Sequence, residues 1–470
     1  DAIDAASGKF NITNRFYFTN LKKYQIHYSV LANGKTVKSG KVSLDIAPQA
    51  SKEFTVPVNG LKARPGTEYF VNFSVIAVEP EPLIPAGYEI AYDQFRLPVE
   101  AERNTYKANG PALQTQTQGD ELTVSSSKVN FVFNKKSGLV TSYKVDGTEY
   151  FKDGFGIQPN FWRAPNDNDY GNGAPKRLHV WKQSSKDFHV TDTKVSTEDK
   201  AVLLQATYLL AAGNLYVVTY KIYPSGIVHV NAKFTSSDMQ AAETEVSEAT
   251  RMATFTPGSD AARKAASKLE VPRIGVRFRL PARMNNVQYF GRGPEENYID
   301  RNHGTIVGVY QTTADKMYFN YVRPQENGHH TDTRWLTLSP NKGSGLAIVA
   351  DSLVGFNALR NSIEDFDSEE ALPHPYQWNN FSPEEVANHD ENAARNVLRR
   401  MHHVNDIIPR DFVEVCVDMK QQGVGGYDSW GARPEPFHQI PANREYNWGF
   451  TLVPIRSGSQ ATEAAKYDYR

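Results

Sequence analysis

Three segments of the sequence contain polar and aromatic side chains more densely than an ordinary strand or turn does. They are residues 160–173 (NFWRAPNDNDYGNG), residues 289–338, and residues 421–434 (QQGVGGYDSWGARP). Paired carboxylates transfer protons, clustered side-chain oxygens bind hard cations, and aromatic faces pack against apolar ring surfaces. These segments are therefore the places where chemistry is expected.

The first segment places four oxygen-bearing side chains in a row, Asn166, Asp167, Asn168 and Asp169. An EF-hand loop needs a glycine at its sixth position, and counting from Asp167 that position is Asn172, so the segment is not an EF-hand. Three interpretations stay open. The side chains bond to the backbone of an irregular loop, line a polar active-site wall, or bind a cation.

The second segment contains four carboxylates and three histidines, namely Glu295, Glu296, Asp300, Glu326, His303, His329 and His330. A pair of carboxylates is what glycoside hydrolysis requires, and a glutamate beside a histidine can transfer a proton at the anomeric carbon of a sugar. The structural alternative is that Arg292 or Arg301 forms ion pairs with these acids. Spacing alone does not place any two of the carboxylates on one face.

The third segment has glycines at 423, 425 and 426, followed by Tyr427, Asp428, Ser429 and Trp430. Glycines permit unusual backbone angles and close approach of neighbouring chains. On such a loop Trp430 can offer a flat face to a sugar ring and Asp428 can accept hydrogen bonds from hydroxyl groups. The alternative is that Trp430 fills a hydrophobic core.

The elements that must position these segments are mainly strands. The chain has 24 tyrosines, 24 phenylalanines and 6 tryptophans, with 32 glycines and 26 prolines to supply turns. In the first hundred residues, short aromatic and β-branched runs alternate with turn signals such as Asn33-Gly34. This spacing predicts an immunoglobulin-like β-sandwich over residues 1–100.

The rest of the chain is expected to contain a linker and one large domain. Residues 101–118 are polar without apolar periodicity and are predicted to be a linker. Residues 119–455 resume the strand pattern and predict a large double sheet, with helices over 260–268 and 383–400. Residues 456–470 are predicted to be a frayed tail. The predicted fold class is all-β.

Charge and cysteine content exclude several classes of protein. Lysine and arginine number 52 and aspartate and glutamate 53, so a net charge of −1 provides no field for nucleic acid. A single cysteine, Cys416, excludes a disulfide framework and a cysteine-rich zinc site but leaves the compartment open. The most apolar stretch, residues 201–220, predicts two strands joined by a turn, so no membrane partner is expected.

Four motifs occur in an order that is characteristic of one family. They are RAPNDND at 163–169, GPEENYIDR at 293–301, PQENG at 324–328 and GGYDSW at 425–430. In these motifs, residues 119–455 resemble the last domain of glycoside hydrolase family 2 β-galactosidases from bacteria. The first sandwich resembles the immunoglobulin-like domain that precedes it in that family.

The resemblance implies a galactose-mutarotase-like supersandwich for the large domain. It also implies that Trp430 stacks on the sugar next to galactose at the mouth of the active site, and that Asp428 orients its loop. The rim of that mouth would include Asn168, Asp169, Gly171 and Asn172. In the family a Ser-Glu pair follows the first motif, whereas this chain has a glycine-rich turn there.

The resemblance places the two catalytic glutamates and the metal ligands of the family in an α/β barrel. The chain lacks the strand-helix alternation of roughly 250 residues that such a barrel needs. We therefore expect no catalytic residue, metal or cofactor site here, and any Mg or Na requirement would reside in the barrel. A longer protein or a leader is expected before Asp1.

The resulting hypothesis is the C-terminal part of a retaining β-galactosidase, inactive alone, within a homo-oligomer of the bacterial cytoplasm or periplasm. Its substrate would be a terminal β-galactoside, bound at a mouth shared with the barrel. Two alternatives remain. One is a stand-alone aldose-epimerase-like enzyme that uses Glu326 with His329 or His330, and the other is a carbohydrate-binding module.

Overall fold

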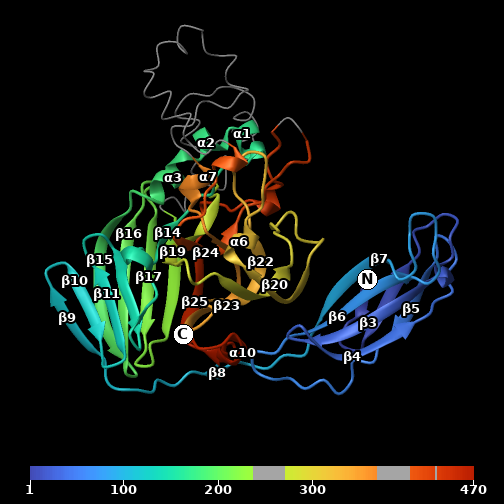
Figure 1. Ribbon diagram of the computed structural model, residues 1–470, viewed down its shortest axis with the longest axis horizontal. Helices are drawn as coiled ribbons and strands as arrows, with labels where there is room; N and C mark the ends of the chain where they lie inside the picture. Colours follow the sequence, from blue (N-terminus) through green and yellow to red (C-terminus); the bar gives the residue numbers. More distant parts are fainter. Residues whose placement is uncertain (237–269, 368–402, 429–430) are drawn as a thin grey trace, which may run out of the picture. The chain divides into compact units, whose positions relative to one another are not determined.

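The computed structural model describes residues 1–236, 270–367, 403–428 and 431–470 (Figure 1). These residues form two compact units. The first contains Asp1–Tyr106, Ile306–Tyr310 and Thr462–Asp468, and the second contains Lys107–Thr305, Gln311–Ala461 and Tyr469–Arg470. Strands dominate both, which confirms the all-β fold class.

The first unit is built on a two-sheet sandwich. One sheet has the order β1-β2-β5 and the other the order β4-β3-β6-β7. Their bounds are Ala2–Asp4 (β1), Lys9–Thr13 (β2), Tyr24–Ala32 (β3), Lys35–Val42 (β4), Ser51–Thr55 (β5), Tyr69–Ala77 (β6) and Glu89–Leu97 (β7). Asn33 and Gly34, with φ of 46° and 77°, form the predicted turn between β3 and β4.

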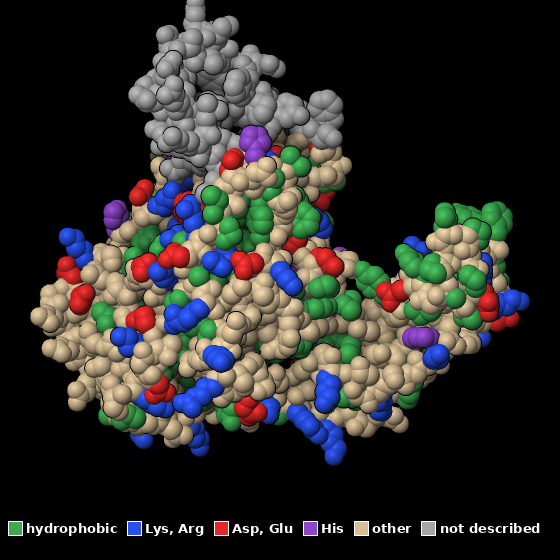
Figure 2. All heavy atoms as spheres, in the orientation of Figure 1, with side chains coloured by type: hydrophobic (Ala, Val, Ile, Leu, Met, Phe, Trp, Pro, Cys, Tyr) green, Lys and Arg blue, Asp and Glu red, His purple; other side chains and the backbone are tan. Residues whose placement is uncertain are grey.

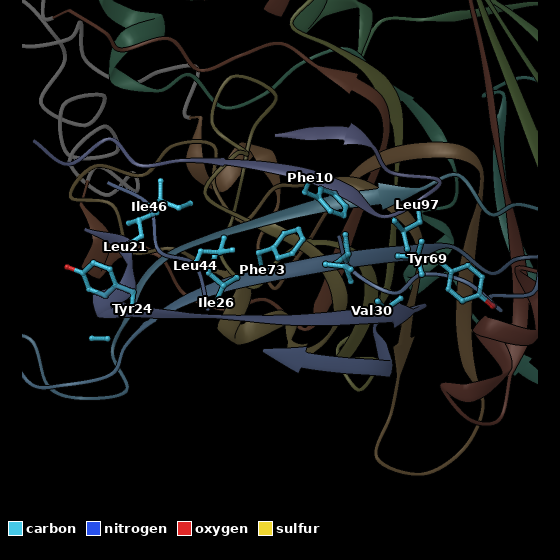
Figure 3. Close-up of a cluster of buried hydrophobic side chains, with 14 residues drawn as sticks. Phe10, Leu21, Tyr24, Ile26, Val30, Leu44, Ile46, Tyr69, Phe73 and Leu97 are labelled. Carbon is cyan, nitrogen blue, oxygen red and sulfur yellow. The ribbon is translucent and has the colours of Figure 1, made fainter. Parts of the chain in front are cut away.

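The core of this sandwich follows the alternation of its strands. Tyr69, Val71 and Phe73 of β6 point into one buried cluster, where Phe73 packs against Phe10 of β2 with ring centroids 4.9 Å apart (Figure 3). A period of two residues places these side chains on one face of the sheet. The sandwich is therefore held together by packing without a disulfide, because the only cysteine of the chain is Cys416.

The second unit contains a five-stranded sheet and most of a twelve-stranded sheet. The smaller sheet has the order β13-β12-β11-β10-β9. Its bounds are Gln114–Gln118 (β9), Glu121–Ser125 (β10), Val129–Asn134 (β11), Leu139–Val145 (β12) and Thr148–Glu149 (β13). It packs on the larger sheet, since Phe131 and Phe133 lie against the ring of Tyr220.

The larger sheet runs β14-β19-β24-β23-β25-β18-β17-β16-β15, and β22, β20 and β21 extend from β23. The bounds are Gln158–Asn160 (β14), His189–Glu198 (β15), Ala201–Leu209 (β16), Leu215–Ile222 (β17), Val228–Thr235 (β18), Arg273–Pro281 (β19), Asn286–Gly293 (β20), Ile306–Thr313 (β21), His330–Ser339 (β22), Gly345–Leu359 (β23), Phe412–Gln421 (β24) and Tyr446–Ile455 (β25). The central strands β19, β23 and β24 are buried on both faces, as in a sheet covered on both sides. The predicted pair of strands within 201–220 is confirmed as β16 and β17.

Helices in the described residues are short. They are α1 (Asp167–Gly171), α2 (Ala174–Arg177), α3 (His179–Ser184), α6 (Ala314–Met317), α7 (Ile363–Phe366) and α10 (Ser459–Ala464), with 3-10 turns at Leu21–Lys23, Lys152–Gly154, Val404–Asp406 and Pro436–His438. None of the helices in this part of the chain is long and apolar enough to span a membrane. The helices predicted over 260–268 and 383–400 lie outside the described residues.

Both predicted irregular segments contain regular structure. The frayed tail is wrong, because α10 buries Ala461 completely and β26 (Tyr467–Asp468) pairs in parallel with β8 (Asn104–Thr105). The predicted linker of residues 101–118 contains β8 and β9. Strand β9 has the sequence QTQTQ and is exposed along its whole length. Because it contains no apolar residue, it lacks the apolar periodicity from which a strand is predicted.

Candidate functional site

The first two polar segments singled out in the sequence both contact the third, at residues 422–425. We call the third segment, residues 421–434, the glycine loop. The loop follows β24, and β19 pairs with both β24 and β14. This pairing brings the chain after β14, where the first segment lies, next to the start of the glycine loop. Strand order in the sheet therefore joins segments that are about 260 residues apart in the sequence.

Arg163 connects the first segment to the glycine loop. Its side chain is 2% exposed and donates from Nη1 to the carbonyl of Gln422 (2.7 Å) and from Nη2 to the carbonyl of Gly423 (3.0 Å). Asp169 holds the guanidinium with both carboxylate oxygens, at 3.0 Å from Nε and 2.8 Å from Nη2. A bidentate pair of this kind fixes the plane of the arginine as well as its charge.

Asp169 also closes the start of α1. The Asn166 side chain accepts from the Asp169 amide at 2.8 Å, and the Asp169 carboxylate accepts from the Asn166 amide at 3.2 Å, which is a capping box. These two side chains bond to the backbone, as one interpretation expected, but they cap a short helix and do not belong to an irregular loop. Among the described residues no group of three or more potential ligands is placed to hold a metal ion.

Helix α1 packs backbone to backbone against the glycine loop. Asn168 donates to the carbonyl of Val424 at 3.1 Å. Gly431 has φ of +86°, and a Cβ atom there would lie 2.4 Å from the carbonyl of Gly171. Glycine is therefore required at 431 by both conformation and space. Asn172 instead organises α2, where its side chain accepts from the Ala174 amide at 3.2 Å.

Asp300, from the second segment, binds the glycine loop from another direction. Its carboxylate accepts from the amides of Val424 (3.0 Å) and Gly425 (2.8 Å). It lies so close that a Cβ atom on Gly423 would be 2.5 Å from its Oδ2. The sequence marked Asp300 as a candidate acid but did not reveal this role, because its partners are backbone groups.

Asp428 lies within the loop and accepts from the amide of Ala432 at 3.1 Å. Ser429 and Trp430 themselves lie outside the described residues, so the stacking of Trp430 on a sugar stays a prediction. The site that the structure describes is the support of the loop that carries Trp430.

Sequence reasoning missed a buried glutamate at the far end of the loop. Glu270 is 3% exposed and forms ion pairs with Arg433 of the glycine loop and with Arg177 of α2. Burial, and secondly the charge of Arg433, lower the pKa of Arg177. No motif contains Glu270, and no sequence signal could have identified it.

A second buried ion network lies beneath the first. Arg273 lies 3.0 Å from Glu326 and 3.3 Å from Asp418. Gln421 donates to Glu326 at 3.1 Å and accepts from Arg163 at 3.3 Å, so it links this network to the glycine loop. Burial raises the pKa of Asp418 to about 7, although the Arg273 charge opposes the shift.

The raised pKa of Asp418 predicts a pH effect on stability. Between pH 3.8 and about 7 the folded protein retains a proton that the unfolded chain releases, so this group lowers the free energy of unfolding as pH rises. The Asp418→Asn variant lacks this contribution. Its free energy of unfolding minus that of the wild type, measured by urea titration, should therefore increase from pH 4 to pH 7.

His329, whose Nδ1 lies 3.8 Å from an Asp418 carboxylate oxygen, makes a contribution of the opposite sign to stability, because burial lowers its pKa to about 3. A pH-independent difference for Asp418→Asn would contradict the assignment.

The predicted pairing of Glu326 with a histidine does not form an accessible acid-base site. His329 is buried, stacks on Tyr298 with ring centroids 5.4 Å apart, and bonds to Asn357 at 3.0 Å. The nitrogens of His330 lie near backbone carbonyl oxygens, 3.1 and 3.2 Å away. A cavity of about 20 Å³ beside Glu326 has room for roughly one water molecule.

Several other charged residues of the second segment form ion pairs. Glu296 pairs with Arg301 at 2.8 Å, which confirms the structural alternative for that acid. Arg292 pairs with Asp332 at 2.6 Å and not with an acid of its own motif. Glu295 remains exposed. Through Asp300, this segment supports the glycine loop.

Comparison with known proteins agrees with the motifs. The family model described as "Beta galactosidase small chain" matches residues 125–452, and that of "Beta-galactosidase, domain 4" matches residues 10–98. Solved structures that match include a putative aldose 1-epimerase from Escherichia coli K12 (TM-score 0.32, 9% identity, 73% of this chain and 99% of that one) and a galactose 1-epimerase from Lactobacillus acidophilus (TM-score 0.33, 9% identity, 75% and 100%). TM-scores this low support no argument about activity.

Three curated relatives that match nearly the whole chain are longer than it. A Beta-galactosidase from Priestia megaterium is 32% identical over 97% of this chain and 38% of its own length. Those from Streptococcus thermophilus and Vibrio cholerae are each 25% identical over 97% and 96% of this chain. The chain spans 38% of the length of these relatives. It belongs to the β-galactosidase small-chain family and represents the C-terminal small-chain part of such a protein.

Proposed function

We propose that the chain is the C-terminal part of a retaining β-galactosidase that hydrolyses terminal β-galactosides. Family membership and the 38% coverage of its relatives support a longer protein. The two catalytic carboxylates of a retaining enzyme lie about 5–5.5 Å apart on either side of the bond that is cleaved. In this proposal both lie outside the chain, as does any Mg or Na site.

The role proposed for this part is to present the glycine loop to the sugar. The observation that carries it is the convergence of two separate segments on three consecutive loop residues, through Arg163, Asn168 and Asp300. A connection between two strands does not need buried charges to hold it. Buried charges that fix a loop before its ligand arrives reduce the ordering entropy lost on binding, so this support favours a binding role for the loop.

Within that role Trp430 provides the face for the sugar and Asp428 fixes the turn that presents it. Asn168 and Gly171 support the loop from α1, and Asp169 acts through Arg163. The site mouth is shared with the part of the protein outside this chain. Assembly of the longer protein as a homo-oligomer belongs to the same proposal.

The isolated chain is expected to show no hydrolysis of a chromogenic β-galactoside above the buffer rate, because it contributes neither catalytic carboxylate. Polarimetry on fresh α-galactose should likewise show no acceleration, since Glu326 and His329 are buried. The longer protein, assayed in parallel, is the positive control. Substantial hydrolysis by the pure chain would overturn the proposal, and catalysed mutarotation would favour the epimerase alternative.

A further inference from the structure

A cavity of about 270 Å³ lies at the base of the glycine loop. Lys420 of β24 lines it and directly precedes the loop in the sequence. Phe437, Gln439, Arg444 and Tyr446 line it from the chain that follows the loop. The volume is just below the range of about 300–1,000 Å³ that is typical of pockets for drug-sized ligands, so the expected ligand is a small one.

Two cations line this cavity without an acid to pair with them. Neither Lys420 nor Arg444 forms an ion pair with another residue that the structure describes. Lys420 is half-buried, and burial alone lowers its pKa. Glu445, beside Arg444 in the sequence, pairs instead with Lys233 at 3.3 Å. Taking a charge out of water is costly unless a counter-charge replaces the water, so this side of the cavity favours an anion.

The groups behind the cavity do not supply that counter-charge. Gln439 accepts from Arg433 at 3.4 Å. Arg433 shares the buried Glu270 with Arg177, so one carboxylate faces two guanidinium groups and these three residues keep a positive charge. By contrast, positive and negative side chains are intermixed over the face of the second unit that Figure 2 shows. The cavity is therefore a local concentration of positive charge.

Two aromatic rings form the apolar part of the lining. Phe437 remains 72% exposed, and its ring centroid lies 4.4 Å from that of His438. Tyr446 donates to the carbonyl of Pro441 at 2.7 Å, and burial raises its pKa to about 12 although the charge of Arg444 opposes the shift. Its hydroxyl is therefore neutral and adds no negative charge. An exposed aromatic face beside unpaired cations suits a sugar ring that carries an acidic group.

We propose that this cavity binds the oxyanion of an acidic sugar, either a carboxylate or a sulfate ester. Arg444 offers a planar fork of donors that matches two oxygens, Lys420 supplies a point charge, and the ring of Phe437 packs against the sugar. The sugar as ligand class rests on the proposed function, because the cavity lies at the base of the loop that carries Trp430. In the longer protein the site favours β-galactosides with an acidic group over neutral ones.

The test is a calorimetric titration of the full chain, at low ionic strength, with galacturonate, galactose 6-sulfate and neutral galactose. At least one acidic sugar should bind about tenfold more tightly than galactose, and which one binds distinguishes a carboxylate site from a sulfate site. Lys420→Met and Arg444→Met should each raise the Kd of that sugar about tenfold or more, because each removes a charged donor. The control Lys342→Met removes an exposed cation that also lacks an ion pair among the described residues, and it should leave the Kd unchanged.

Absence of saturable binding, or equal affinity for all three sugars, would overturn the proposal. An equal loss of affinity in Lys342→Met would also overturn it, because the effect would then reflect overall charge. Inorganic sulfate bound as tightly as galactose 6-sulfate, with Phe437→Ala unchanged, would refute the sugar. If Lys420→Met fails to fold, Arg444→Met decides, because that side chain is exposed. The readout is binding, so failure of the proposed hydrolysis leaves its result intact.

Discussion

Replacing Arg163 with methionine is expected to lower the free energy of unfolding by about 3–5 kcal/mol, because it leaves the Asp169 carboxylate buried without its partner. The two side chains are 2% and 5% exposed, so water cannot replace the lost hydrogen bonds. The glycine loop also loses the two donors that hold the carbonyls of Gln422 and Gly423. Amide exchange in residues 423–425 should therefore accelerate along with the loss of stability in urea.

The control is Arg323→Met, which removes an exposed ion pair with Asp167 of α1, together with a hydrogen bond to the Pro165 carbonyl and a contact with the Tyr170 ring. The Arg323 and Asp167 side chains are 25% and 63% exposed, and a pair of this kind is worth about 0–1 kcal/mol. A loss of stability in Arg163→Met no larger than in Arg323→Met would contradict the role assigned to Arg163. A large loss of stability with unchanged amide exchange in residues 423–425 would show that Arg163 stabilises α1 but does not hold the glycine loop.

Replacing Gly431 with alanine is expected to displace the glycine loop from α1. The new Cβ would lie 2.4 Å from the carbonyl of Gly171, a contact that the backbone must move to relieve. The positive φ of 86° adds roughly 1–2 kcal/mol of strain. The expected result is a destabilisation larger than that strain alone, with faster amide exchange at both Gly171 and residues 423–425.

Gly173→Ala is a matched control for this variant. Gly173 also has a positive φ, of 72°, but a Cβ there would meet no atom within 4 Å. It therefore introduces the strain without the collision, and the loop should keep its wild-type exchange rates. Identical loss of stability in the two variants would show that the close approach of Gly431 and Gly171 is not important.

The sequence predicted the parts of the site better than their arrangement. Arg163, Asp300 and the glycine loop lie in segments whose density of polar residues and glycines marked them in advance. Their meeting depends on the order β14-β19-β24, in which β19 is the strand shared by the two segments. Strand order between residues this far apart is set by tertiary packing, which local patterns do not encode.

Residues outside the motifs were harder to predict. Glu270 and Asp418 are single acids whose importance comes from burial beside arginines, and neither has a signature in its neighbours. The last fifteen residues illustrate a second limit. Small alanine side chains in α10 and two tyrosines beyond it give little hydrophobic periodicity, yet Ala461 and Tyr469 are buried.

The epimerase alternative shows how sequence proximity can mislead. Glu326 and His329 are only three positions apart, which suggests an acid-base pair. In the structure Glu326 accepts from Arg273 at 3.0 Å, and His329 bonds to Asn357 at 3.0 Å, so each has a structural partner of its own. Both residues are buried, and Glu326 is joined to the glycine loop by a hydrogen bond from Gln421.

The most direct test of the account is steady-state hydrolysis of lactose by the longer protein that contains this chain, with Trp430→Ala compared with the wild type. If the glycine loop presents Trp430 to the sugar beside galactose, the loss of a stacking face should raise KM about tenfold or more, at 1.4 kcal/mol for each factor of ten. The unfolding midpoint should stay unchanged. An unchanged kcat/KM for lactose in the folded variant would contradict the account.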